Sequence, residues 1–143
     1  MQEENNTNDD RTINILVVED NPVNVFLVKT IIQKLLPRVA LIHAENGVEA
    51  ITKFKDHALD LIFMDLNLPM INGLEAAYEI RQLENSDEHV PIIVLSGERK
   101  TDVRAMEMTD DIDDYISKPL RIDAMRKIIS KYLNGAAKII ELS

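Results

Sequence analysis

Short apolar runs that end in carboxylates constrain this chain more than any other feature. The run at residues 15–18 (ILVV) is followed by Glu19 and Asp20, and the run at residues 61–64 (LIFM) is followed by Asp65. A carboxylate at the end of a buried strand is costly unless something uses its charge. If the two strands are parallel neighbours, the three acids meet at one edge of a sheet, where they would attract a cation.

Apolar runs rich in β-forming residues recur along the chain, at residues 13–19, 39–44, 60–65, 90–96 and 113–117. These runs are continuously apolar rather than alternating, which is typical of strands buried on both faces of a parallel sheet. Segments with helical spacing separate them, so the pattern predicts β-α units with helices on both faces and right-handed crossovers.

The helical segments carry apolar stripes and chemical start signals. One stripe is expected to comprise Val23, Phe26, Leu27, Thr30, Ile31 and Leu35, and a weaker one Leu74, Ala77, Tyr78 and Leu83. Asn21 before Pro22 predicts an N-cap followed by proline at the first helical position. Asn46 and Asn72, each before glycine, are expected to cap or turn into the next two helices.

Composition excludes several classes of protein. A chain of 143 residues is long enough for one domain, and its net charge of −9 argues against a nucleic-acid surface. It has no cysteine, which excludes disulfides and zinc–thiolate sites, and its apolar runs are too short to span a bilayer. We expect a cytoplasmic protein with a disordered acidic tail at residues 1–11, one domain at 12–134 and a tail of unknown role at 135–143.

Polar residues follow four of the five expected strands. Glu19 and Asp20 end the first strand, Asp65 ends the third, Ser96 ends the fourth, and Lys118 follows the fifth. Each of these alone is most simply the start of a loop. Because parallel sheets place their sites at the carboxyl ends of the strands, the sequence predicts that all of them share one rim.

Four motifs carry a family resemblance. Residues 17–21 (VVEDN), 64–69 (MDLNLP), 95–97 (LSG) and 117–119 (SKP) resemble, in order and spacing, those of the receiver domain of two-component response regulators. The resemblance covers roughly residues 13–133. It implies a flavodoxin-like, doubly wound α/β fold with a five-stranded parallel sheet in the order 2-1-3-4-5.

The resemblance also implies a chemistry. Asp65 would accept a phosphoryl group from a histidine of a histidine kinase or histidine phosphotransfer protein. Mg²⁺ (or Mn²⁺) would be held by Asp20 and Asp65, by Glu19 through a water and by the backbone carbonyl of Asn67, an oxygen-only set that suits Mg²⁺. Lys118 would pair with Asp65 and then with the phosphoryl group. Such a protein is no conventional enzyme, although it catalyses its own phosphorylation and dephosphorylation.

Further positions acquire roles through the same resemblance. Ser96 and Tyr115 would form the switch, which reshapes the face made by the fourth helix, the fifth strand and the last helix. Asn67 and Glu98 match positions that tune the lifetime of the acyl phosphate, and this pair predicts a short-lived one. The Lys-Pro step at residues 118–119 is usually cis in the family.

One segment departs from the family pattern. The turn before the fifth strand carries four aspartates within residues 110–114, where the family often has a glycine. Asp111 would have to take the left-handed conformation that glycine adopts freely. We expect a solvated acidic turn here rather than a second cation site.

Three other classes of protein were weighed. A haloacid dehalogenase-type phosphohydrolase needs a second carboxylate two residues after its aspartate, where this chain has Asn67. A flavodoxin needs a phosphate-binding loop after the first strand, and the acidic pair Glu19-Asp20 would repel a phosphate. A receiver that acts only as a phosphorylation-independent interaction module is disfavoured because Asp20, Asp65 and Lys118 are all present.

Partners follow from the same comparison. We expect a phosphodonor protein and a downstream protein target, with no nucleic acid and no membrane, and either a monomer or a phosphorylation-dependent dimer. Residues 18–24 resemble the receivers of hybrid kinases and phosphorelays, whereas the acidic start of the chain favours a stand-alone protein. The sequence leaves the two open.

Overall fold

Strands and helices alternate along the whole domain. The computed structural model describes residues 12–97 and 100–133. Its elements are β1 (Ile13–Val18), α1 (Pro22–Leu35), β2 (Val39–Ala44), α2 (Gly47–Asp56), β3 (Leu61–Asp65), α3 (Gly73–Leu83), β4 (Ile92–Ser96), α4 (Lys100–Glu107), β5 (Asp114–Ser117) and α5 (Ile122–Tyr132). The five predicted strands are therefore confirmed, with four of them shorter by one or two residues than expected.

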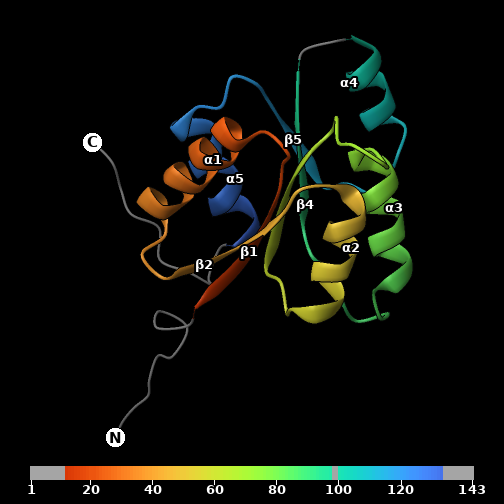
Figure 1. Ribbon diagram of the computed structural model, residues 1–143, viewed down its shortest axis with the longest axis horizontal. Coiled ribbons are helices and arrows are strands. Elements are labelled where there is room, and N and C mark those ends of the chain that lie inside the picture. The colour runs from red at the N-terminus through yellow and green to blue at the C-terminus, as the bar shows by residue number, and fades with distance from the viewer. Residues whose placement is uncertain (1–11, 98–99, 134–143) are drawn as a thin grey trace, which may run out of the picture.

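The sheet is parallel throughout, in the order β2-β1-β3-β4-β5, as expected. Helices α1 and α5 cover one face, and α2, α3 and α4 cover the other (Figure 1). Strand β1 lies between β2 and β3, so the winding reverses direction beside it. The carboxyl ends of β1 and β3 are neighbours at this point, where open α/β sheets bind their ligands.

Two apolar clusters, one on each face of the sheet, form most of the core. Strands β3 and β4 are buried at every position. Alternate residues of these strands enter opposite clusters: Phe63 packs on the α1 and α5 side, whereas Ile62 and Met64 pack on the α2 and α3 side. The strands read as unbroken apolar runs because both of their faces are covered.

The predicted helix starts are confirmed. The side chain of Asn21 caps α1 by accepting hydrogen bonds from two backbone N–H groups, with Pro22 at the first helical position. Asn46 caps α2 by accepting from the backbone of Glu49 at 2.8 Å, and Asn72 forms a reciprocal capping box on α3. Because Asn21 directly follows the acids of β1, its cap also fixes where the chain leaves the sheet.

The predicted buried stripe of α1 is partly wrong. Val23 and Phe26 are 74% and 73% exposed, and Leu27 is 39% exposed. The buried residues of this helix are Val28, Ile31, Ile32 and Leu35. The first half of α1 carries apolar residues on more than one face, so helical spacing alone predicted the wrong face to be buried. That face instead exposes an apolar surface to solvent.

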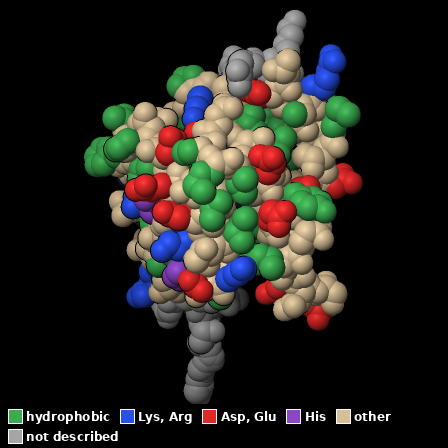
Figure 2. All heavy atoms as spheres, turned by 45° about the vertical axis from the view of Figure 1, so that its right-hand side comes forward, with side chains coloured by type: hydrophobic (Ala, Val, Ile, Leu, Met, Phe, Trp, Pro, Cys, Tyr) green, Lys and Arg blue, Asp and Glu red, His purple; other side chains and the backbone are tan. Residues whose placement is uncertain are grey.

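The expected stripe of α3 is also partly wrong. Tyr78 is 50% and Leu83 42% exposed, whereas the helix buries its small residues together with Ile80. Figure 2 brings the α3 side forward and shows acidic side chains between apolar ones across this surface. The small side chains let α3 pack closely on the sheet, which turns the larger residues outward.

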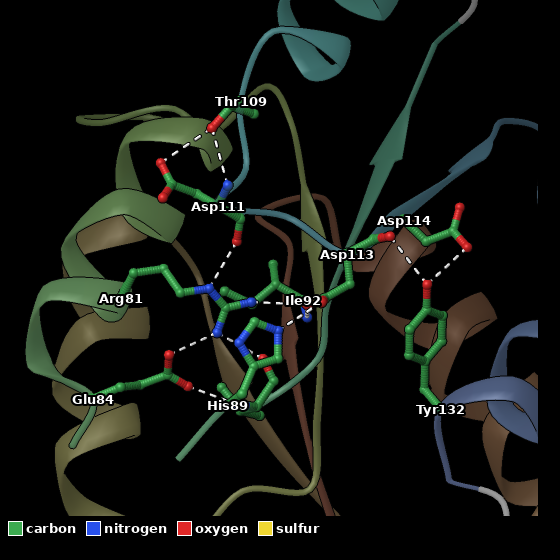
Figure 3. Close-up of polar contacts among 10 residues, drawn as sticks. Arg81, Glu84, His89, Ile92, Thr109, Asp111, Asp113, Asp114 and Tyr132 are labelled. Atoms are coloured by element: carbon green, nitrogen blue, oxygen red, sulfur yellow. Dashed lines mark hydrogen bonds and ion pairs between the residues drawn. The ribbon is translucent and has the colours of Figure 1, made fainter. Parts of the chain in front are cut away.

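The aspartate-rich turn was expected to be solvated, but most of its carboxylates have partners within the protein. The Asp113 carboxylate accepts hydrogen bonds from Arg81 Nη2 and the Ile92 backbone, each at 2.8 Å, and lies 2.6 Å from His89 Nε2 (Figure 3). Arg81 donates in all to Asp111 O, Glu84 Oε1, Val90 O and Asp113 Oδ2. The turn is held by a cation that comes from α3, far away in the sequence.

Neighbouring aspartates of the turn are also paired. Asp111 accepts a hydrogen bond from the Thr109 hydroxyl at 3.1 Å, and Asp114 lies 3.0 Å from the Tyr132 hydroxyl and 3.4 Å from Lys131 Nζ. Asp111 does not take the left-handed conformation expected of it, since Met70 is the one non-glycine residue with positive φ in the described ranges. No second acidic metal cluster is found among those residues.

Candidate functional site

Three carboxylates meet at the carboxyl ends of β1 and β3, as predicted. Glu19, Asp20 and Asp65 each offer an oxygen within 4.8 Å of the others. Glu19 and Asp65 are buried, at 1% and 5% exposure, whereas Asp20 is exposed. The cluster is thus a shallow acidic site with two of its acids in the sheet edge and one at the rim.

Glu19 is the most perturbed group of the site. Burial raises its pKa above the ordinary value, and the negative charge of Asp65 adds to this, against opposing effects from the Asn21 backbone N–H and Lys118. Its Oε2 accepts a hydrogen bond from that N–H at 3.1 Å. Its Oε1 is buried without a hydrogen-bond partner among the described residues. A buried carboxylate oxygen without a hydrogen-bond partner, next to two further acids, fits an acceptor for a cation.

Lys118 supplies the positive charge. Its Nζ lies 3.2 Å from Asp65 Oδ1 and 3.8 Å from Glu19 Oε1, while its backbone N–H donates to Ser96 O at 2.7 Å. The peptide bond between Lys118 and Pro119 is cis, as expected. One ammonium therefore faces two carboxylates, which leaves the cluster with excess negative charge.

The loop after β3 wraps tightly around Asp65. The backbone N–H of Asn67 donates to Asp65 Oδ1 at 3.3 Å, while the Asn67 side chain is exposed. A Cβ added to Gly73 would stand 2.6 Å from the Asp65 carbonyl oxygen, closer than real contacts allow. Met70 carries a φ of 74° in the same loop. The return of the chain is possible because residue 73 has no side chain.

The expected switch residues lie on adjacent strands. Ser96 is fully buried and its hydroxyl donates to the carbonyl of Gly97 at 3.0 Å. Tyr115 is half-buried and packs beside the small cluster of Leu66, Val94 and Met106. The cluster therefore joins the residue after Asp65 to the strand that carries Tyr115. Glu98, the other expected tuning residue, lies outside the described residues.

Sequence reasoning missed one contact of this site. His43, on β2, places Nε2 2.8 Å from the Glu19 carbonyl oxygen. The end of β2 offers no motif, and only the strand register, which pairs His43 with Val17, brings its ring to the rim. The contact could be predicted only once the strand order is known, because His43 then pairs with the residue two positions before Glu19.

Residues 15–130 match the family described as the response regulator receiver domain. The chain belongs to this family. The receiver domain of the sensor histidine kinase PA1611 from Pseudomonas aeruginosa PAO1, solved with a magnesium ion coordinated in its active site cleft, has a TM-score of 0.75 at 28% identity. That comparison covers 86% of this chain and 98% of the other.

Two further relatives set this receiver domain in context. The receiver domain of the response regulator Ssk1 of Saccharomyces cerevisiae, solved with the histidine phosphotransfer signaling protein Ypd1, has a TM-score of 0.72 at 32% identity, over 85% of this chain and 88% of that chain. Hybrid signal transduction histidine kinase G of Dictyostelium discoideum is 33% identical over 84% of this chain and 4% of its own length.

The receiver domain is a small part of many of its relatives. It spans 4% of Hybrid signal transduction histidine kinase G and 14% of the sensor protein GacS of Pseudomonas syringae. In the described part of the chain, no helix is both long and apolar enough to cross a bilayer.

Proposed function

We propose that this receiver domain accepts a phosphoryl group on Asp65 from a phosphohistidine of a partner protein. The observation that carries the proposal is the convergence of Glu19, Asp20 and Lys118 on Asp65 at the strand ends. The alternatives lack this support. A haloacid dehalogenase-type phosphohydrolase needs a second acid at the position where this chain has Asn67, and an interaction module needs no such cluster.

The carboxylate cluster fits a divalent cation. The donors are hard oxygens, their charge exceeds that of the single ammonium, and Glu19 Oε1 has no hydrogen-bond partner among the described residues. Such a set suits Mg²⁺ or Mn²⁺. We infer that Asp20 and Asp65 bind the ion directly, with Glu19 acting through a water and the carbonyl of Asn67 completing the protein ligands. When bound, the ion would neutralise charge on the incoming phosphoryl group.

Transfer then depends on groups of this chain. A carboxylate oxygen of Asp65 attacks the phosphorus atom, the bond from phosphorus to the donor imidazole breaks, and its electrons return to the imidazole nitrogen, which takes up a proton. Lys118 lies within hydrogen-bond distance of Asp65 already, so it would follow the charge onto a phosphoryl oxygen. Arginine should substitute poorly, since its planar guanidinium cannot act as the same mobile point charge.

The exposed apolar surface of α1 supports a protein donor. Asp65 is 5% exposed, so a donor histidine must enter the rim to reach it. Val23, Phe26 and Leu27 begin just after Asp20 on the helix that leaves this rim, and their side chains lie in solvent. Exposed large apolar side chains at one place mark a protein interaction site. We propose that a histidine kinase or histidine phosphotransfer protein covers this surface, in keeping with the Ssk1 receiver that was solved with Ypd1.

The response would be carried by Ser96 and Tyr115. The Ser96 hydroxyl, now bonded to a backbone carbonyl, would turn to the phosphoryl group, and Tyr115 would move into the space that the loop vacates. The surface of α4, β5 and α5 would then present a changed face to a downstream protein, or to a second copy in a phosphorylation-dependent dimer. Asn67, exposed beside Asp65, and Glu98 would shorten the phosphate's lifetime by placing a water.

Labelling with a small phosphodonor tests the acceptor. With acetyl phosphate and Mg²⁺, intact-mass measurement should show one added phosphoryl group, absent from Asp65→Asn and lost when Mg²⁺ is chelated. An unlabelled parent protein would refute the proposal.

Protein-to-protein transfer tests the α1 surface separately. Phe26→Ser should keep labelling by acetyl phosphate but slow transfer from a phosphorylated histidine phosphotransfer domain. Met108→Ser is the matched control, because it removes a similarly exposed apolar side chain from the turn that follows α4. Equal slowing by both variants would argue against α1 as the docking surface.

A further inference from the structure

The Glu19 carbonyl lies one step beyond the end of a strand ladder. Its own residue's N–H still donates to Ala44 O at 3.0 Å, as in the ladder. Strand β2 ends at Ala44, and the N–H of Glu45, the next residue, donates to Glu49 Oε1 at 2.9 Å as the chain turns into α2. The ring of His43 takes the place of the missing ladder donor, with Nε2 2.8 Å from the carbonyl oxygen. A carbonyl only accepts, so Nε2 carries the proton and donates.

This carbonyl is covalently tied to the rim acid. The Glu19 carbonyl and the Asp20 nitrogen belong to one planar peptide unit, so the hydrogen bond from His43 fixes the tilt of that unit. No hydrogen bond or ion pair with the described residues holds the Asp20 carboxylate, which is exposed. The backbone alone therefore aims Asp20, and the ring of His43 restrains that backbone from β2.

We propose that His43 is a positioning residue for the cation site, one that orients the Glu19–Asp20 peptide so that Asp20 faces the ion. The inference rests on the proposed function, because it concerns the cation of that same site. Mg²⁺ demands near-octahedral geometry at about 2.0–2.1 Å, so a small tilt of a ligand is felt strongly. Groups that orient metal ligands typically alter metal affinity by about 10- to 100-fold.

Mg²⁺ affinity measured without phosphorylation provides the test. In NMR titrations of labelled protein with MgCl₂, His43→Leu should raise the dissociation constant by about tenfold, the low end expected for a single orienting group. His43→Gln keeps an N–H donor at similar reach and should restore most of the affinity. His57→Leu is the matched control, because the ring of His57 also lies against a backbone carbonyl, that of Lys53 at 3.1 Å, away from the site.

The outcomes separate positioning from simple stabilisation. Urea midpoints are measured for every variant, and a fall in midpoint with unchanged Mg²⁺ affinity after His43→Leu overturns the inference. Equal weakening of Mg²⁺ binding by His43→Gln and His43→Leu overturns it too. If the leucine variant does not fold, His43→Asn takes its place in the comparison with His43→Gln. A parent protein that takes up no Mg²⁺ refutes the proposed function itself, whereas a parent that binds as tightly as His43→Leu refutes this inference alone.

Discussion

Replacing Asp113 by alanine should lower the free energy of unfolding by about 3 kcal/mol, although this residue lies at the opposite end of the sheet from Asp65. Its two oxygens serve three groups: Arg81 Nη2, the Ile92 backbone N–H and His89 Nε2 (Figure 3). These groups come from α3, from the start of β4 and from the segment between them. One carboxylate thus connects the start of β5 to α3 and to the amino-terminal end of β4.

The magnitude follows from burial. Breaking a fully buried ion pair costs about 3–5 kcal/mol. The side chains of Arg81 and Asp113 keep 11% and 18% exposure, and Arg81 retains three other acceptors, so about 1.5 kcal/mol is the fitting share. The Ile92 N–H, left without its acceptor, adds about 1.5 kcal/mol. His89 is 57% exposed and adds little, as exposed pairs do.

A double-mutant cycle in urea measures this pair. Unfolding of Asp113→Ala, Arg81→Ala and the double variant is followed by circular dichroism, and a loss of about 3 kcal/mol moves the midpoint by roughly 1.5 M at a typical urea slope. We expect a coupling energy of about 1.5 kcal/mol between the two residues. Asp123→Ala is the control, because its pair with Arg121 is exposed at 3.6 Å. A coupling energy near zero, or equal shifts for the two aspartates, would refute the reasoning.

Three further changes test the loops and acids of the site. Met70→Gly should raise the unfolding free energy by about 1 kcal/mol, since φ is 74° there, and an unchanged urea midpoint would contradict this. Gly73→Ala should cost about 1–3 kcal/mol and slow labelling of Asp65, because its Cβ meets the Asp65 carbonyl; Gly97→Ala, whose Cβ would meet nothing within 4 Å, is the control for stability. The raised pKa of Glu19 means that stability falls as pH rises from the ordinary glutamate pKa to the raised one, so Glu19→Gln should stabilise the metal-free protein above that range. That gain should shrink in saturating Mg²⁺, and equal urea midpoints without Mg²⁺ would count against a buried charge.

Much of the site could be predicted because its acids lie next to their strands in the sequence. Each acid lies at or just after the end of its strand, and strands that are apolar throughout indicate a parallel sheet, so the sequence alone places Glu19, Asp20 and Asp65 at one rim. The family resemblance then supplied the strand order and the pairing of Lys118 with Asp65, whose Oδ1 lies 3.2 Å from Lys118 Nζ.

What escaped prediction depends on orientation and register. The apolar residues at the start of α1 satisfy helical spacing on more than one side, and only the angle of the helix on the sheet decides that Phe26 faces solvent. Arg81 reaches Asp113 across 32 positions, and His43 reaches Glu19 across 24. No periodicity encodes such pairs, because each requires two strands or helices to be set against each other first.

The two acidic ends of the sheet show what distinguishes a working carboxylate from a structural one. At the amino-terminal ends of β4 and β5, Asp113 has a donor for each oxygen, and Arg81 supplies a positive charge to the aspartate-rich turn. At the carboxyl ends of the strands, Glu19 keeps a buried oxygen without a hydrogen-bond partner among the described residues, and Lys118 faces two acids. An excess of buried negative charge of this kind lowers stability, so it is expected where a ligand completes the site. Pairing, rather than the number of acids in a segment, therefore distinguishes the proposed cation and phosphoryl site around Asp65 from the structural acids of the turn.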